Sequence, residues 1–303
     1  IDEYLAGPGL TSKKDDGKLL TYVKEVKPDW VVMNDYSNDT ITEKTWKEIG
    51  KICKTSNWFG DDNHRYDNYT KYKASFFTHP ITCDFFSYDK YLRDGYINVI
   101  QSQWAAFNFD LVVEEETDAF LYDVTFIGTY SPYRKCVYDF LKRNQVNVRF
   151  YGNGWPGGKI TLCQMKNIFR TSKINLNLEK LATNYDIRFL LKNPMRILSF
   201  LKRTVLKKSY YTVTKQIKQR HFDIPMAGGF QLTEYIPMIE QYFEIGNQIV
   251  VFATLEDLLC FIRYYLARED KRKEIAKAGF NRTMNQHLMI HRWQEVIKQL
   301  KEK

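Results

Sequence analysis

The chain has 303 residues, of which 44% are hydrophobic and 16% aromatic, which excludes a disordered or collagen-like protein and allows two domains with sizeable cores. No stretch approaches the roughly 18 uncharged apolar residues that a membrane-spanning helix needs. The five cysteines are odd in number and form no CxxC pair, so reduced thiols and a cytoplasmic protein are expected.

The net charge of +9 comes from one segment. Residues 188–222 contain ten Lys and Arg and no acid, whereas the rest of the chain carries 35 Lys and Arg against 36 Asp and Glu. Such a local field points to an anionic partner. Within it, Met195–Lys208 predicts a basic amphipathic helix. This helix either lies on an anionic membrane surface or packs on its own domain with its charges in water.

Apolar bursts alternate with amphipathic stretches of helix length, a pattern typical of a parallel sheet covered by helices. In the first part of the chain, strands are predicted at Trp30–Asn34, Lys54–Phe59, Ala74–Thr78 and Ile97–Gln101, and a helix at Thr42–Ile52. The first convincing strand comes late, so the N-terminal domain is expected to be incomplete. The acidic, aperiodic stretch Asp110–Thr117 is the predicted domain boundary.

The second part repeats the pattern. Strands are predicted at Asp123–Gly128, Val146–Tyr151, Lys173–Leu178 and Phe230–Thr233, and helices at Tyr133–Arg143, near Phe222–Gly228, after the N-cap Thr254, from Asp270 to near Gly279, and through Trp293 to the end. These elements predict an α/β chain of two Rossmann-like domains facing a cleft. Residues 1–118 would form an acceptor-side domain and 119–285 a nucleotide-binding domain with a basic insertion at about 186–212. Residues 286–303 would form a C-terminal helix that packs back toward the N-terminal domain.

The run Lys215–Glu234 places Lys218 and Arg220 beside a short helix that ends at Gly228 and Gly229, where a strand begins. Cations, a carboxylate and bare backbone N–H groups would then meet at the carboxyl edge of a sheet, where open α/β folds bind nucleotides. Taken alone, the pattern equally fits a helix-turn-strand with a basic surface.

Lys215–Thr233 resembles the signature QIKxRxFEIPxxGGFxLT of the CgeB-type glycosyltransferases. The likeness extends over about residues 123–293, including Tyr151–Trp155, Ser172–Asn177 and Tyr242–Val250, and is thin before Asp110. This family is similar to the retaining GT-B enzymes of glycosyltransferase family 4. The resemblance implies transfer of a sugar from a nucleotide-diphosphate donor to a hydroxyl acceptor, which would be a cell-surface, lipid-linked or protein glycan. No metal requirement is expected, because two Lys or Arg side chains and a helix N-terminus could take the place of a metal at the diphosphate. No cofactor and no nucleic-acid partner are expected either.

In family 4, a glutamate at the start of the equivalent helix binds the ribose hydroxyls of the donor, and Asp223 occupies this position. Lys215 stands eight residues earlier, where the larger class carries a second glutamate, so the two-glutamate motif is broken. Lys218, Arg220 and Arg134 are expected to hold the diphosphate and stabilise the leaving group, because charge grows there in the transition state.

Further donor-site candidates follow predicted strands. The turn Gly128, Thr129, Tyr130 can bring backbone N–H groups to a diphosphate. Gly152, Asn153 and Gly154 belong to a formal GxGxxG, but Pro156 has no N–H and Trp155 is bulky, so a nucleotide contact is expected rather than a nicotinamide fingerprint. The remaining candidates are Asn175, Gly228, Gly229 and Thr233.

On the acceptor side, Asp61 and Asp62 follow a predicted strand, with His64 nearby, and can act as a base or hold an acceptor hydroxyl. His79, expected at the end of another strand, is a second candidate. Adjacent acids in loops are also commonly solvated or capping residues.

Two other functions remain open from the sequence. A chain of this type can be a catalytically inactive nucleotide-sugar binder. The basic segment, with Tyr210 and Tyr211 beside it, also permits a nucleic-acid-binding module. His287 and His291 are four residues apart on a predicted helix, but without a third ligand they are expected to be solvated or packed rather than to bind zinc.

Overall fold

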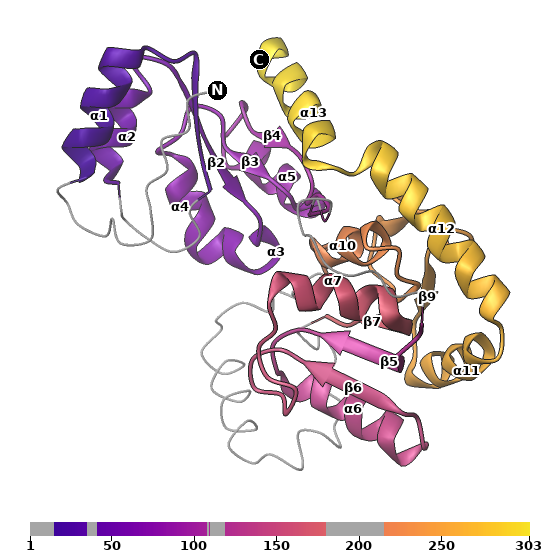
Figure 1. Ribbon diagram of the computed structural model, residues 1–303. Coiled ribbons are helices and arrows are strands. Elements are labelled where there is room, and N and C mark those ends of the chain that lie inside the picture. The colour runs from indigo at the N-terminus through magenta and orange to yellow at the C-terminus, as the bar shows by residue number, and fades with distance from the viewer. Residues whose placement is uncertain (1–14, 35–40, 108, 110–118, 180–214) are drawn as a thin grey trace. The chain divides into compact units, whose positions relative to one another are not determined.

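The structure, a computed structural model, describes residues 15–34, 41–107, 109, 119–179 and 215–303 (Figure 1). The chain divides into two compact units, which are unit 1 (Ile1–Trp104 and Arg292–Lys303) and unit 2 (Ala105–His291). Each unit is built on its own parallel sheet, so the predicted α/β class with two Rossmann-like sheets is confirmed. The predicted helix Met195–Lys208 and the predicted boundary Asp110–Thr117 both lie outside the described residues.

Unit 1 contains a four-stranded parallel sheet of order β1-β2-β3-β4. Its elements, in chain order, are α1 (Asp15–Val26), β1 (Trp30–Met33), α2 (Glu43–Ile49), β2 (Lys54–Phe59), α3 (Asp62–Arg65), the π-helix η1 (Tyr66–Thr70), α4 (Lys71–Ala74), β3 (Ile81–Thr82), α5 (Phe85–Arg93), β4 (Ile100–Gln101) and most of α13 (Met289–Glu302). The helices α1 and α2 pack together through buried side chains that include Val23 and Trp46.

The C-terminal helix α13 belongs to unit 1 from Arg292 onward. Val296 and Leu300 are buried against Trp58 and Ile100. The amide of Gln299 also satisfies the edge strand β4, since Nε2 donates to the carbonyl of Gln101 at 2.8 Å and Oε1 accepts from its N–H at 3.1 Å. Hydrophobic burial and edge pairing together therefore fix residues 292–303 on this sheet.

The predicted strand Ala74–Thr78 is wrong. Ala74 ends α4, and the next strand is β3, which starts only after Pro80. Between them, Thr78 pairs with Thr55 largely through side-chain hydroxyls, since the N–H of Thr55 donates to Thr78 Oγ1 at 2.7 Å and the N–H of Thr78 donates to Thr55 Oγ1 at 3.0 Å. Aromatic residues in this stretch imitate a strand pattern but pack beside a helix, as Phe77 does against Trp46.

Unit 2 contains a five-stranded parallel sheet of order β6-β5-β7-β8-β9. Its elements are β5 (Tyr122–Ile127), α6 (Pro132–Arg143), β6 (Val148–Tyr151), α7 (Leu162–Thr171), β7 (Ser172–Asn177), α10 (Arg220–Met226), β8 (Gln231–Glu234), the 3-10 helix η3 (Ile239–Gln241), β9 (Val250–Phe252), α11 (Leu255–Leu266) and α12 (Glu269–Gln286). This is the doubly wound order 2-1-3-4-5, whose topological switch point lies between the first and third strands. In this chain these are β5 and β7.

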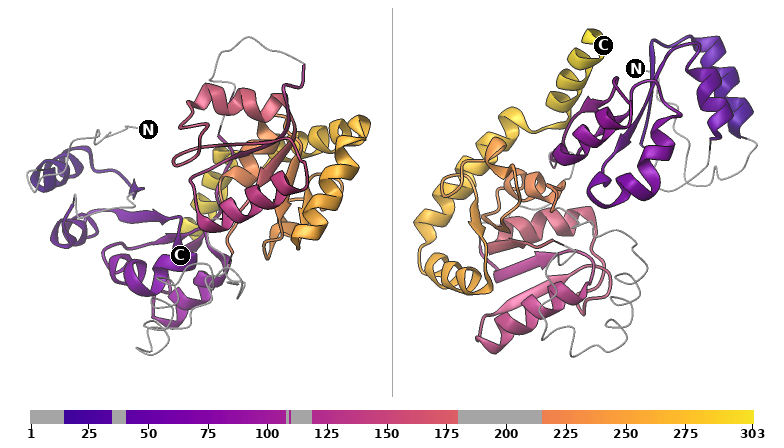
Figure 2. Two further views of the ribbon diagram at one scale, coloured as in Figure 1. Left: turned by 90° about the horizontal axis from the view of Figure 1, so that it is seen from below. Right: turned by 180° about the vertical axis from the view of Figure 1, so that it is seen from behind.

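Helices cover both faces of this sheet. Val137 of α6 and Ile262 of α11 join one buried core with the strands. Figure 2 shows α6 and α7 on opposite faces. The helix α12 does not end at Gly279 as predicted. A Cβ at that position would lie 2.5 Å from the carbonyl oxygen of Gln248, so a glycine within α12 allows the backbone of Gln248 to pack directly against the helix.

Candidate functional site

The carboxyl edge of the unit 2 sheet carries the candidate site, because β5 and β7 form its switch point and open α/β sheets bind ligands beyond the carboxyl ends of the strands there. The turn after β5 is tightly bound to the turn after β6. The N–H of Gly128 donates to the carbonyl of Tyr151, and that of Tyr130 to Asn153, both at 2.8 Å. The N–H of Thr129 makes no hydrogen bond within the described part of the chain.

Glycine is required where these two turns touch. Gly152 has φ +118°, and a Cβ there would lie 2.4 Å from the carbonyl oxygen of Gly128. Gly154 has φ +84°, and its Cβ would lie 2.7 Å from that of Tyr130. The second turn closes on itself through the N–H of Gly152 and the carbonyl of Gly158 at 2.7 Å, so no helix opens through these glycines. The expectation against a nicotinamide fingerprint agrees with this geometry.

Arg220, the first residue of α10, lies against the first turn. A Cβ added to Gly128 would be 3.1 Å from Arg220 Nη1. Burial lowers the pKa of this guanidinium, while Asp223 and Glu179 oppose the shift. Among the described residues, no hydrogen bond reaches its nitrogen atoms. Two residues earlier, Lys218 Nζ donates to the amide oxygen of Gln216 at 2.7 Å.

Arg134 has a different position from the one expected of a phosphate ligand. It is buried, and its Nη1 donates to the carbonyl of Thr129 at 2.8 Å. Nε and Nη2 both donate to the carbonyl of Leu178, at 3.2 and 2.6 Å. The guanidinium therefore ties the end of β5 to the end of β7. Burial lowers the pKa of Arg134 to about 10, which leaves it charged at neutral pH.

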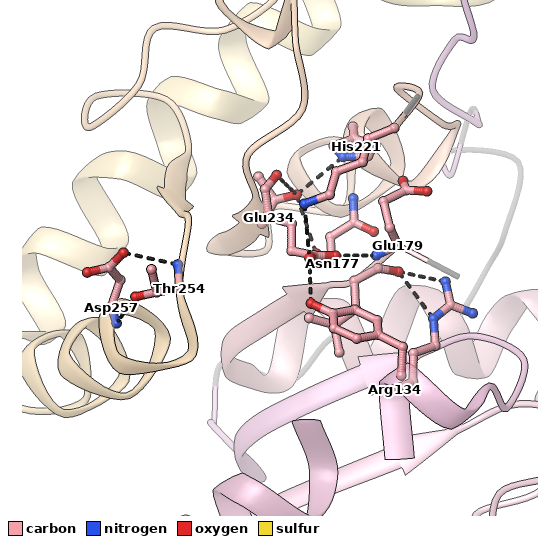
Figure 3. Close-up of polar contacts among 11 residues, drawn as sticks. Arg134, Asn177, Glu179, His221, Glu234, Thr254 and Asp257 are labelled. Atoms are coloured by element: carbon pink, nitrogen blue, oxygen red, sulfur yellow. Dashed lines mark hydrogen bonds and ion pairs between the residues drawn. The ribbon is translucent and has the colours of Figure 1, made fainter. Parts of the chain in front are cut away.

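Two glutamates at this edge were missed by the sequence analysis (Figure 3). Glu234, the last residue of β8, is buried, and its Oε1 accepts hydrogen bonds from the hydroxyl of Tyr133 and from Lys215 Nζ, the latter at 3.2 Å. Its Oε2 accepts from the N–H of Glu179 at 2.7 Å. Burial raises the pKa of Glu179 to about 7, against the lowering effect of nearby cations, of which Lys218 is the strongest.

The remaining predicted donor residues lie deeper in unit 2. Asp223 is buried, accepts from the N–H of Phe107 at 2.8 Å, and has a pKa raised by burial to about 6. Asn175 is buried within the sheet, where its Nδ2 donates to the carbonyl of Phe169 at 2.9 Å. Thr233 Oγ1 lies 3.2 Å from His221 Nε2. Gly228 takes a left-handed turn at φ +76°, and a Cβ at Gly229 would lie 2.7 Å from Asn175 Nδ2.

In unit 1, the structure brings three of the four acceptor-side candidates together after β2. Asp62 is 1% exposed, and its Oδ2 accepts from Thr82 Oγ1 at 2.7 Å and from the hydroxyl of Tyr91 at 3.0 Å. Burial raises the pKa of Asp62 to about 7. Asp61 is half-buried beside it, and His64 is exposed with Nδ1 2.8 Å from the amide oxygen of its neighbour.

His79 was expected at the end of a strand, but it lies just before the start of β3. Its N–H donates to the carbonyl of Thr55 at 2.9 Å, near the start of β2, so it lies at the opposite edge of the sheet from Asp61 and Asp62. Burial lowers the pKa of His79 to about 4. His287 and His291 are likewise not on one helix, since His287 caps the end of α12 and His291 lies in α13.

Within the part of the chain that the structure describes, no cluster of three or more His, Cys, Asp or Glu side chains is placed to hold a metal ion. No helix among the same residues combines the length and apolar character needed to cross a membrane.

Two parallel Rossmann-like sheets, each in its own unit, define the class of fold as GT-B, and solved structures share this fold. HepE from Anabaena, in complex with UDP-glucose, matches 95% of this chain and 82% of its own with a TM-score of 0.62 and 11% identity. TarM matches 92% of this chain with a TM-score of 0.59 and 9% identity, and this chain spans only 57% of TarM. A glycosyltransferase from Rickettsia africae matches 100% of this chain and 83% of its own, with a TM-score of 0.56 and 10% identity. Identities this low establish the fold alone.

The sequence pattern of the glycosyl transferase-like family matches residues 134–298, more than half of the chain. The chain belongs to this family. No curated protein matches the sequence.

Proposed function

We propose that this chain transfers a sugar from a nucleotide-diphosphate donor to a hydroxyl group of an acceptor glycan. The observation that carries the proposal is the Arg220 guanidinium, which lies against the Gly128 turn at the switch point and makes no hydrogen bond within the described residues. An arginine in that position suits a diphosphate, because its planar fork binds phosphate oxygens in pairs. The N–H of Thr129 adds a backbone donor at the same turn.

The proposed chemistry relies on charge stabilisation of the leaving group. As the bond from the sugar to the diphosphate breaks, negative charge grows on the phosphate, and cations already fixed there lower the barrier. Arg220 and Lys218 supply that charge without requiring a metal ion. Retention of configuration and membership of the CgeB-type group belong to the same proposal, which the resemblance of Lys215–Thr233 supports.

The class of donor and acceptor follows from related folds. The HepE structure contains UDP-glucose, and a mutant TarM of S. aureus is described in complex with fondaparinux, alpha-GlcNAc-glycerol and UDP. By analogy, a uridine diphosphate sugar is the first donor to test, and a glycan or lipid-linked hydroxyl the first acceptor. The proposed setting is the cytoplasm, with peripheral contact at the inner face of the membrane through Met195–Lys208, which lies outside the described residues.

A thermal-shift screen with UDP, GDP, ADP, CMP and dTDP tests the proposal first, because a ligand that binds only the folded chain raises its melting temperature. Titration calorimetry then measures the preferred diphosphate against Arg220→Ala and Lys218→Ala. Each variant is expected to lose roughly 1.5–3 kcal/mol of binding free energy. Arg143→Ala, an exposed position in the last turn of α6, is the matched control.

Unchanged affinity in both site variants would remove the two cations from the donor site, and a parent that binds none of the diphosphates would overturn the function. A parent that binds a nucleotide sugar but never cleaves its sugar–phosphate bond, with or without acceptor glycans, would be an inactive binder instead.

A further inference from the structure

The peptide unit that joins Leu178 to Glu179, directly after β7, is held at both of its polar atoms by buried charged side chains (Figure 3). Arg134 donates two hydrogen bonds to its carbonyl oxygen, at 3.2 and 2.6 Å. Glu234 accepts the hydrogen bond of its N–H at 2.7 Å. A cation and an anion thus fix one peptide group from opposite sides.

Such an arrangement is costly if it serves only to end a strand, because burying an arginine and a glutamate requires removing both from water. A neutral hydroxyl or a backbone group would satisfy the same carbonyl and N–H. What the charged pair adds is a fixed backbone at Glu179, and hence a fixed direction for its side chain.

The backbone of Glu179 is therefore fixed at the carboxyl edge that also carries Arg134, Lys215 and Glu234. Burial and Glu234 raise the pKa of its carboxyl, whereas Lys218, Arg134 and Lys215 lower it, and Glu179 opposes the lowering of the pKa of Arg220. A carboxylate repels a diphosphate held at the same cations. An uncharged part of the donor that carries hydroxyl groups suits this position better, because a carboxylate accepts strong hydrogen bonds from hydroxyls.

We propose that Glu179 accepts hydrogen bonds from hydroxyl groups of the transferred sugar, and that Arg134 and Glu234 are positioning residues that hold it for this contact. The inference rests on the proposed function and names the group that distinguishes a nucleotide sugar from its bare diphosphate. It also gives Arg134 a role different from that of a direct phosphate ligand.

The test first identifies which of UDP-glucose, UDP-galactose, UDP-N-acetylglucosamine and GDP-mannose binds the parent most tightly. It then compares the affinity for this nucleotide sugar with the affinity for the corresponding nucleoside diphosphate. Glu179→Gln should weaken the sugar nucleotide about tenfold or more while the diphosphate binds as well as before or better, because a nearby negative charge is gone. Glu179→Asp, which keeps the charge but retracts it, should show a smaller change in the same direction. The matched control is Asp123→Asn, a lysine-paired carboxylate near the start of β5 at the opposite edge of the sheet.

Positioning is tested by a double-mutant cycle. Arg134→Lys alone should lower the ratio of the affinity for the nucleotide sugar to the affinity for its diphosphate. In the Glu179→Gln background the same substitution should change this ratio little further. Arg272→Lys is the control for general damage, since Arg272 is also buried and donates to backbone carbonyls, including that of Leu266 at 3.1 Å. It should lower the melting temperature and leave the ratio unchanged.

Equal losses of the sugar nucleotide and the diphosphate in Glu179→Gln would overturn the proposal in favour of a structural or ribose contact. An unchanged ratio in both Glu179 variants would overturn it as well. A parent that binds no nucleotide at all would instead refute the proposed function, so the two failures are distinguishable.

Discussion

The buried carboxyl of Asp62 should make the stability of unit 1 depend on pH. Its side chain is 1% exposed, Oδ2 accepts two hydrogen bonds, and Oδ1 has no partner within the described residues. Burial disfavours the charged form, and the pKa of Asp62 rises from 3.8 to about 7. The folded chain therefore keeps a proton that the unfolded chain releases between about pH 4 and pH 7.

The sign and size of the effect follow from proton linkage. Because the folded state binds more protons in this interval, stability from Asp62 is fully present below about pH 4 and is lost as the pH rises through about 7. The interval between the two pKa values corresponds to about 4 kcal/mol. Asp62→Asn removes the titration but retains an amide oxygen that can accept from Thr82 and Tyr91. The stability advantage of the parent over the variant should fall by about 4 kcal/mol across this interval.

Urea denaturation of parent and variant at intervals from pH 4 to pH 8, followed by tryptophan fluorescence, measures this difference. The signal reports mainly on unit 1, because five of the six tryptophans lie in it, namely Trp30, Trp46, Trp58, Trp104 and Trp293. Asp67→Asn, at a carboxylate that pairs with Lys90 at 3.2 Å, controls for loss of a negative charge in the same unit. Parallel stability curves for parent and Asp62→Asn would show that burial does not set the ionisation of this group.

Three further predictions concern unit 2. Gly152→Ala should destabilise it by about 3 kcal/mol in urea titrations, through a left-handed φ and a clash at 2.4 Å, whereas Gly158→Ala, with φ +65° and open space, should cost about 1 kcal/mol. Thr254→Ala removes a capping box in which the N–H of Asp257 donates to Thr254 Oγ1 at 3.0 Å, and should lower the free energy of unfolding by about 1 kcal/mol. Asp223→Asn keeps an oxygen that can accept from the N–H of Phe107, but an amide accepts less well from two ribose hydroxyls than a carboxylate does. Calorimetry should therefore show a larger loss of affinity for ribonucleotides than for 2′-deoxyribonucleotides. Equal losses would make Asp223 purely structural.

Two buried strands were predicted closely. Lys54–Phe59 was predicted to the residue, and Asp123–Gly128 within one residue of β5. Predictions failed where a residue in the sequence serves a contact with a distant part of the chain rather than its local structure. Gly279 is a usual signal for a helix end, yet here it makes room for the backbone of Gln248 inside α12. Nothing in the neighbouring sequence contains that contact.

The candidate site was likewise predictable where local sequence marks it and unpredictable where distant residues meet. The rule that ligands bind beyond strand ends predicts a site at Gly128 and at the cations after Lys215, and the structure places one of these cations, Arg220, against Gly128. The same rule, applied to β7 and β8, would have selected Glu179 and Glu234. The hydrogen bonds that Glu234 accepts from Tyr133, Lys215 and the N–H of Glu179 join positions up to about a hundred residues apart in the sequence, and neither local pattern nor propensity predicts such pairings.

The distribution of charge at the carboxyl edge gives each cation a different task. Arg134 is committed to two backbone carbonyls, and Lys215 pairs with the buried carboxylate of Glu234 at 3.2 Å. These two cations are used in building the site. Arg220 is half-buried and makes no hydrogen bond within the described residues, and burial lowers the pKa of its guanidinium. An arginine in that position gains from an anion that supplies hydrogen-bond acceptors, because the described protein groups around it supply none. Ligand affinity should therefore depend far more on Arg220 than on Arg134 or Lys215, whose removal should first be evident as lost stability.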